Sequence, residues 1–223
     1  MVYRHEWKHI INRSDQLVLQ KRLSAVMQPD PHAVEGKYSI RSLYFDTLTD
    51  QALREKLDGV SQREKFRIRY YNGDTSLIHL EKKSKLAGLG TKQNVPLSVC
   101  EAQAIVEGDY TWMRQNPDPL ITEFYSKLLS QQLKPKTIVD YTRKPYLFPA
   151  GNVRVTIDYD IRTGLWHTDF LNPNCITVPA RDAPILLEVK WDAYLPDIIR
   201  NLVQLNGRSS CAFSKYAACR VYG

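Results

Sequence analysis

Basic side chains recur at every second position in several segments of this chain, in a pattern suited to binding phosphate groups. Arg67 and Arg69 are two residues apart in an otherwise apolar segment. Because successive side chains of a β-strand point to opposite faces, both guanidinium groups would lie on one face. Each presents a planar fork of donors that matches phosphate oxygens. Lys83 on the next predicted strand extends this face, and the competing interpretation is salt bridging to nearby carboxylates such as Glu81.

Carboxylates stand among these cations at positions that could hold a divalent metal ion. Glu188 and Lys190 share one face of an apolar predicted strand, and Glu6 and Lys8 have the same spacing near the N-terminus. Mg²⁺ and Mn²⁺ prefer oxygen ligands, and Mg²⁺ commonly bridges a protein to phosphates. We therefore interpret Glu188 as a metal ligand, and Glu6 as a further ligand or the partner of a neighbouring cation. Internal Glu–Lys ion pairs and a solvated strand face are the alternatives.

A third charged segment alternates Arg154, Asp158, Asp160 and Arg162 with apolar residues. This pattern predicts a strand with all four side chains on one face. The two aspartates could be metal ligands or counter-charges to the arginines. We favour the role of counter-charge for Asp160.

A zinc-protease pattern also occurs near the N-terminus. His5-Glu6-Trp7-Lys8-His9 matches HExxH, which needs a helix so that both imidazoles point the same way. The segment precedes the first helix-capping signal and has no evident third ligand. We therefore do not favour a zinc site.

The composition fits a soluble globular protein with an anionic partner. The 223 residues are 43% hydrophobic and 25% charged, with a net charge of +7. Phosphates, nucleic acid and an acidic membrane surface are the candidate partners, although basic proteins without such partners are common. No nucleic-acid-binding signature is present, so nucleic acid is not expected. The four cysteines lack metal-ligand spacing, and no signal peptide or spanning segment is evident, which predicts free thiols and a cytoplasmic protein.

Periodicity and turn signals predict an α+β fold with a mainly antiparallel sheet, and no linker divides residues 1–223 into separate domains. Curling the sheet into a barrel with its charged face inward would create a basic lumen and place the apolar face against helices outside. The strands are expected at 3–11, 40–45, 66–71, 76–85, 137–141, 153–161 and 185–191. The helices are expected at 14–27, 99–107, after Pro119 and at 196–205, with a short helix or turn at 46–56. The glycines at 88 and 90 predict a loop before Lys92. Ser14 or Asp15 is expected to cap the first helix.

An ordered set of motifs resembles the VTC domain, the catalytic module of the vacuolar transporter chaperone polyphosphate polymerases, within the triphosphate tunnel metalloenzymes. Single motifs are weak, but the set spans nearly the whole chain. It comprises Arg4-x-Glu6-x-Lys8, Ser42-Leu43-Tyr44-Phe45-Asp46, Lys65-Phe66-Arg67-Ile68-Arg69-Tyr70, Leu80-Glu81-Lys82-Lys83, Asp140-Tyr141-x-Arg143, Val153-Arg154-Val155-x-Ile157-Asp158, Leu187-Glu188-Val189-Lys190 and Ser214-Lys215-Tyr216.

The resemblance implies an eight-stranded antiparallel β-barrel tunnel with helices outside. It implies that Glu188 binds Mn²⁺ or Mg²⁺ and that Lys215 lies beside the transferring phosphate. Arg4 stands where the wider superfamily has the first Glu of an ExExK pattern, which leaves fewer carboxylates for a second metal ion. The implied triphosphate and chain contacts are Lys8, Arg67, Arg69, Lys83, Lys92, Tyr141, Arg143, Arg154, Lys190 and Ser214.

The sequence therefore predicts a polyphosphate polymerase that transfers the γ-phosphoryl group of ATP to a polyphosphate chain. Arg67 and Arg69 would orient the phosphates, and Lys215 would stabilise the transferring group. A tripolyphosphatase or nucleoside triphosphatase of the same fold is the first alternative, because a sequence does not reveal whether water or phosphate is the acceptor. A polyphosphate-binding module without turnover is the second.

Overall fold

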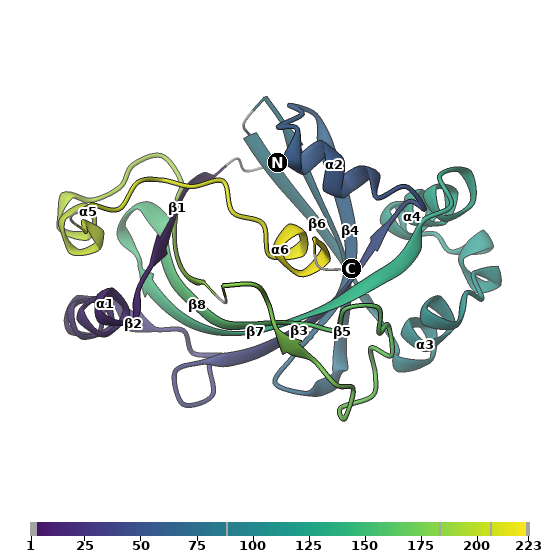
Figure 1. The fold of residues 1–223 in the computed structure, drawn as a ribbon, viewed down its shortest axis with the longest axis horizontal. Helices are drawn as coiled ribbons and strands as arrows, with labels where there is room; N and C mark the ends of the chain where they lie inside the picture. Colours follow the sequence, from purple (N-terminus) through teal and green to yellow (C-terminus); the bar gives the residue numbers. More distant parts are fainter. Residues whose placement is uncertain (1–3, 88, 183, 206, 222–223) are drawn as a thin grey trace.

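The computed structural model describes residues 4–87, 89–182, 184–205 and 207–221. Eight strands form one curled antiparallel sheet in the order β1-β10-β8-β7-β3-β4-β5-β6 (Figure 1). Two short strands lie off this path, where β2 pairs with β7 and β9 pairs with β8. The bounds are β1 His5–Ile11, β2 Gln28–Pro29, β3 Tyr38–Asp46, β4 Arg63–Tyr71, β5 Asp74–Leu86, β6 Leu89–Leu97, β7 Lys134–Phe148, β8 Val153–Thr163, β9 Val178–Pro179 and β10 Ile185–Trp191.

The predicted α+β fold with an eight-stranded antiparallel sheet is confirmed, and the sheet has the shape of a half-barrel. Its path begins at β1 and ends at β6, and within the described ranges these two strands do not pair with each other. The outer edge of β1 instead meets the segment that leads to the C-terminal helix, where the Cys211 amide donates to the Lys8 carbonyl at 2.8 Å. The sheet is therefore an open half-barrel, and its concave face takes the place of the expected barrel lumen.

Strand β4 shows why the sheet has one charged and one apolar face. Phe66 and Ile68 are almost fully buried on the convex side, where they join a core that includes Phe124 of helix α4. Burying each such side chain contributes about 1.5–3 kcal/mol. The alternating residues Arg67 and Arg69 consequently face the concave side.

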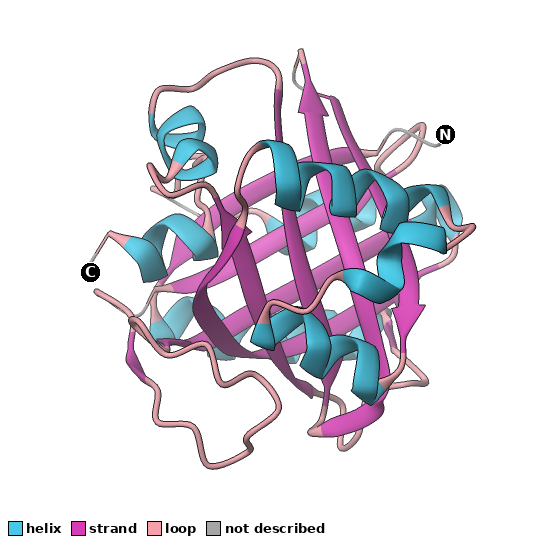
Figure 2. Ribbon diagram, turned by 90° about the vertical axis from the view of Figure 1, so that its right-hand side faces the viewer, coloured by secondary structure: helices cyan, strands magenta, loops and turns pink. Residues whose placement is uncertain are grey.

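Helices cover the convex face on two sides. Helices α3 (Val99–Glu107) and α4 (Pro119–Ser130) pack on one side, with the 3₁₀ turn Thr111–Gln115 between them, and Figure 2 shows helices lying across the strands there. Helices α1 (Arg13–Val26) and α5 (Asp197–Val203) cover β8, β10 and β1. A second 3₁₀ turn, Ala150–Asn152, joins β7 to β8. None of the helices in the described part of the chain is both long and apolar enough to cross a bilayer.

The predicted N-terminal cap of α3 is confirmed, whereas α1 has a different cap from the one expected. Ser98 and Glu101 form the predicted capping box of α3. The first helix begins earlier than expected, because Asn12 is its N-cap and forms a capping box with Asp15. Tyr3 was expected to begin a strand and Gly88 to lie in a loop. Both residues are outside the described ranges.

Helix α6 (Lys215–Arg220) was not expected, and it lies against the concave face rather than outside (Figure 1). Tyr216 and Cys219 pack with Tyr44, Tyr141 and Ile161 in a core of their own. Helix α2 (Gln51–Leu57) contacts both α6 and β4 at one end of the half-barrel. All four cysteines are free.

Two local expectations were wrong. A β-bulge interrupts β8 at Asp160, which has φ 51° and is exposed, so the predicted one-face alternation ends there. Arg162 consequently leaves the charged face and donates from Nε to Thr177 Oγ1 at 3.0 Å. The expected loop before Lys92 is instead strand β6, because Lys83 and Lys92 are register partners on β5 and β6.

Candidate active site

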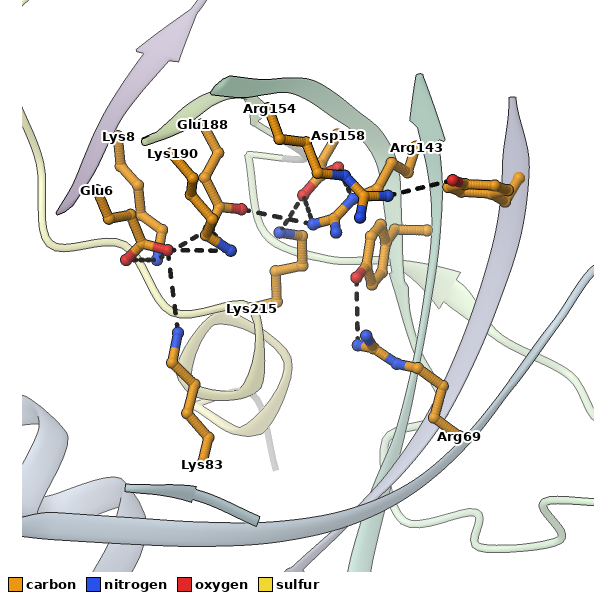
Figure 3. A network of polar contacts seen from close by, with 12 residues as sticks. Glu6, Lys8, Arg69, Lys83, Arg143, Arg154, Asp158, Glu188, Lys190 and Lys215 are labelled. Atoms are coloured by element: carbon orange, nitrogen blue, oxygen red, sulfur yellow. Dashed lines mark hydrogen bonds and ion pairs between the residues drawn. The ribbon is translucent and has the colours of Figure 1, made fainter. Parts of the chain in front are cut away.

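Strands β1 and β10 place two carboxylates and two ammonium groups together on the concave face (Figure 3). Glu6 lies opposite Lys190, and Lys8 lies opposite Glu188. Lys190 Nζ is 2.8 Å from Glu188 Oε1 and 3.3 Å from Glu6 Oε1, while Lys8 Nζ is 2.9 Å from Glu6 Oε2. The two glutamates thus share ammonium groups in an alternating quartet.

The surroundings of Glu188 keep its carboxyl group ionised. Burial raises its pKa, but the charges of Lys190 and Lys8 outweigh burial and hold the pKa well below its usual value. Burial lowers the pKa of Lys8, but attraction to Glu188 and Glu6 outweighs burial and raises this pKa above its usual value. Both groups are therefore charged at neutral pH.

Asp158 is fully buried beside the quartet and is bound by two cations. Arg143 donates to it from Nε and from one terminal nitrogen, both at 2.7 Å, and Lys215 Nζ is 2.6 Å from Oδ2. Arg143 also reaches Glu188 Oε2 at 3.4 Å. Burial raises the pKa of Asp158, yet Arg143 and Lys215 lower it overall. Of the two roles left open for Asp158, this geometry supports that of counter-charge.

Helix α6 positions Lys215 at the centre of the concave face. Its ammonium group lies 4.6 Å from the centroid of the Tyr141 ring, in addition to its ion pair with Asp158. Ser214 is the N-cap of α6, and its Oγ accepts from the Ala217 amide at 3.4 Å. The cap fixes the helix start, and with it the origin of the Lys215 side chain.

Glu81 organises the opposite wall of the half-barrel. It accepts from Arg67 Nε at 2.7 Å, pairs with Lys92 Nζ at 2.5 Å, and is 3.9 Å from Arg69. The Arg67 guanidinium also donates to the buried Tyr44 hydroxyl at 2.6 Å. Burial raises the pKa of Glu81, but Arg67, Arg69 and Lys92 together depress it strongly. One carboxylate therefore orients three predicted phosphate contacts.

The two walls meet through Tyr141 on β7. Arg69 donates to its hydroxyl at 3.2 Å, and the Arg143 guanidinium lies 5.5 Å from its ring centroid. Arg154 on β8 is held separately, by Asp30 at 3.1 Å and by the Tyr38 hydroxyl at 3.1 Å. The aromatic rings thus connect cations that come from different strands.

Lys83 reaches across the half-barrel from β5 towards β1. Its Nζ is 4.0 Å from Glu6 Oε1 (Figure 3). Burial, followed by the charges of Lys8 and Lys190, lowers the pKa of Lys83 to about 7. An anion bound between the walls would therefore favour the charged form of this lysine.

The carboxylates fit a hard divalent cation that takes few protein ligands. Glu6 and Glu188 converge on the same ammonium group, and Asp158 is occupied by its own cations. In the described ranges, no group of three or more His, Cys, Asp or Glu side chains is arranged to hold a metal ion. Mg²⁺ commonly binds through one or two carboxylates, with waters and substrate phosphates completing its ligands. Glu6 and Glu188 match that donor set.

The zinc alternative does not fit the structure. The HExxH segment is strand β1, so His5 and His9 point away from the face that carries Glu6. His5 stacks on Trp191 with ring centroids 5.3 Å apart. A helical zinc site is therefore absent from this segment.

The comparisons identify the family. The VTC domain model matches residues 3–222. The chain belongs to the VTC domain family. A search of curated proteins found no match.

Solved structures of the same fold come from Hippeastrum and from Pyrococcus horikoshii. A Hippeastrum protein, described as a candidate adenylyl cyclase with a dominant triphosphatase activity, is 14% identical over 100% of this chain and 96% of its own, with a TM-score of 0.55. A Pyrococcus horikoshii protein is 12% identical over 97% of this chain and 99% of its own, with a TM-score of 0.52. At these identities, the likeness shows a shared fold.

The VTC chain brings its predicted site residues to one face, while their individual roles stay predictions. Ser214 differs from the rest, because its hydroxyl caps a helix. Sequence reasoning had offered Glu81 as a salt-bridge partner of Arg67 and Arg69, which the structure shows. It missed the organising roles of Tyr44 and the Asp30–Tyr38 pair. Tyr44 lay in one of the family motifs, whereas Asp30 and Tyr38 gave no signal of a role in the site.

Proposed function

We propose that this chain is a metal-dependent polyphosphate polymerase, acting as one domain over residues 1–223, that transfers the γ-phosphoryl group of ATP to a polyphosphate chain. The observation that carries the proposal is the convergence of cations from many strands on one concave face. There they outnumber the carboxylates that neutralise them. The cations are Lys8, Arg67, Arg69, Lys83, Lys92, Arg143, Arg154, Lys190 and Lys215, and the carboxylates are Glu6, Asp30, Glu81, Asp158 and Glu188.

Phosphoryl transfer requires mainly alignment and neutralisation of charge on the phosphate oxygens. Arg67 and Arg69 would orient the triphosphate from one wall, and Arg143 from the other. Lys215, which Asp158 and the Tyr141 ring hold in place, would stabilise charge on the transferring group. Mn²⁺ or Mg²⁺ held by Glu188 and Glu6 would neutralise charge on the phosphate oxygens.

Hydrolysis is the second candidate function. The structurally similar Hippeastrum protein is described as having a dominant triphosphatase activity. The same face could align water instead of a terminal phosphate as the acceptor. A binding module that holds polyphosphate without turnover is the third reading.

One assay separates these functions. The protein is incubated with ATP and Mn²⁺, with Mg²⁺ in a parallel reaction, and long polymer is resolved from free phosphate. Polymer supports the polymerase, and free phosphate without polymer supports hydrolysis. Tight binding of polyphosphate without either product supports the binding module, and it would overturn the proposal.

A further inference from the structure

Thr156 on β8 carries a hydroxyl group that is buried without a hydrogen-bond partner among the described residues. The residue is only 4% exposed. An unpaired polar group in the interior destabilises a folded protein, and buried hydroxyl groups are therefore usually paired. The position of Thr156 should accordingly bring its hydroxyl close to a group with which it pairs when the protein is at work.

The other buried threonines of the described ranges all have partners. Thr137 Oγ1 and Thr163 Oγ1 are 3.2 Å apart, and Thr163 Oγ1 also donates to a backbone carbonyl at 2.9 Å. Thr47 Oγ1 accepts from the Gln51 amide at 3.0 Å. Thr156 is thus an exception among the threonines of this sheet.

Sheet register places Thr156 on the charged concave face, opposite Glu188. Thr156 lies between Arg154 and Asp158 in the alternation of β8, and Figure 3 shows both of these neighbours on the concave side. Its register partner on β10 is Glu188, and its partner on β7 is Pro145, whose ring has no polar atom. Directly opposed residues of an antiparallel pair have Cβ atoms about 4.5–5.5 Å apart. The Glu188 carboxylate is therefore within reach of the hydroxyl.

Of the two carboxylates nearest in the sheet, Glu188 has the greater capacity to accept a further hydrogen bond. Asp158 already accepts three contacts of 2.6–2.7 Å from Arg143 and Lys215, and it lies two residues along the same strand, at roughly 6.6 Å. Glu188 Oε2 has a longer contact with Arg143, at 3.4 Å. A carboxylate oxygen can accept two hydrogen bonds. Glu188 is thus the better acceptor for Thr156.

In this structure, ammonium groups orient the Glu188 carboxylate. Lys190 Nζ is 2.8 Å and Lys8 Nζ is 3.7 Å from the same oxygen, Oε1. A divalent cation at Glu188 and Glu6 would repel both lysines, because like charges at this distance are unfavourable. The Thr156 hydroxyl is neutral and would not be repelled. Hydrogen bonds from neighbouring groups commonly hold a metal-binding carboxylate in its orientation.

We propose that Thr156 is a positioning residue of the metal site, and that its hydroxyl donates to the Glu188 carboxylate when Glu188 binds a divalent cation. The inference rests on the proposed function for the role of Glu188 as a metal ligand. It adds that a neutral hydrogen bond takes over from the lysines in orienting this carboxylate.

The test measures both Mn²⁺ affinity and thermal stability of Thr156→Val, which replaces the hydroxyl by a methyl group of similar shape. Free Mn²⁺ is quantified by electron paramagnetic resonance without ATP, and Tm is measured in the presence of EDTA. Mn²⁺ should bind at least about tenfold more weakly, as is typical when such a partner of a metal ligand is lost. Tm should not fall, because the substitution removes an unpaired buried hydroxyl. Thr156→Ser keeps a hydroxyl and should bind Mn²⁺ as the wild type does.

Thr137→Val is the matched control. It also removes a buried threonine hydroxyl from the sheet, but this hydroxyl is paired with Thr163. The control should lower Tm and leave Mn²⁺ affinity unchanged. The opposite responses of the two valine variants separate a hydrogen bond that stabilises the fold from one that orients a metal ligand.

Unchanged Mn²⁺ affinity in Thr156→Val would overturn the inference, as would a fall in its Tm or equally weak binding by Thr156→Ser. Glu188→Gln shows how far a failure extends. If this variant binds Mn²⁺ as tightly as the wild type, or if the wild type binds none, the metal assignment of the proposed function fails together with the inference. The polymerase activity fails separately, if the wild-type protein forms no polymer from ATP while Mn²⁺ binding responds to Thr156 as expected.

Discussion

At the scale of single residues, neighbouring charges decide which groups on the concave face are ionised. Glu188 and Glu81 are almost completely buried, yet the cations around them keep both pKa values low. Lys65 is in the opposite situation, because burial and the nearby cations Arg67, Lys8 and Lys215 lower its pKa to about 8. Glu188 and Glu81 are therefore ionised at neutral pH, whereas the protonation of Lys65 depends on whether an anion is bound nearby.

Replacing Glu188 by Gln should reduce metal-dependent turnover by more than about 100-fold, because loss of even an outer-shell partner of a metal typically costs 10–100-fold. The substitution removes one of two converging carboxylates and keeps the side chain's size. Turnover is measured with ATP over a range of Mn²⁺ concentrations. Glu107→Gln, an exposed substitution at the end of α3, is the matched control. A wild-type rate in the Glu188 variant would remove this residue from the metal site.

Polyphosphate binding near pH 8 should be accompanied by proton uptake. Lys65, with a pKa of about 8, and Tyr44, whose pKa burial raises but Arg67 and Lys65 lower to about 7, are both partly or largely deprotonated there. A bound anion raises both pKa values, so each group gains protons. Calorimetry in buffers of different ionisation enthalpy measures the number taken up. Lys65→Met should reduce that number, and an unchanged value would contradict the assignment.

At the scale of elements, short-range signals located most strands and helices, and the site depends on how they pair. Strands β1 and β10 are far apart in sequence, yet their register sets Glu6 opposite Lys190. Helix α6 is only six residues long, and it carries Lys215 to Asp158 on β8. Its position depends on the stacking of Tyr216 on Tyr44, with ring centroids 5.0 Å apart.

Removing the N-cap of α6 should affect both stability and the site. Ser214→Ala should lower the free energy of unfolding by about 1 kcal/mol, a typical cost of losing such a cap. It should also lower turnover, because Lys215 is the first residue of the helix. Denaturant unfolding and the ATP assay measure the two effects. Ser214→Asn retains a capping side chain and should restore the stability; if Asn is as destabilising as Ala, capping is not the reason.

At the scale of the whole molecule, the half-barrel gathers positive charge that an anion can neutralise. Because the ligand binds the folded concave face and not the unfolded chain, tripolyphosphate should stabilise the fold. At a free concentration of 100 times Kd, the gain is about 2.7 kcal/mol. Thermal unfolding followed with increasing tripolyphosphate measures the shift in Tm, and added salt should reduce it. A Tm that is insensitive to tripolyphosphate would indicate that these cations do not form a shared binding face.

The sequence by itself determined the alternating strands, the charged face and the family, because side-chain alternation and turn chemistry are local properties of the chain. It located Arg67 and Arg69 on β4, and the capping box of α3. It did not reveal the bulge at Asp160, since a bulge depends on how β8 pairs with β7. Nor did it predict β6, because the glycine-containing sequence around Gly90 suggested a loop, and only pairing with β5 makes this segment a strand.

Only the tertiary structure decided which carboxylate neutralises which cation. Glu81 could be seen beside Lys83 in sequence, but its contacts with Arg67 and Lys92 arise from three strands meeting on one face. Electrostatic pairing acts through space over a few ångströms, and the distances between strands are set by sheet register and curvature rather than by separation along the chain.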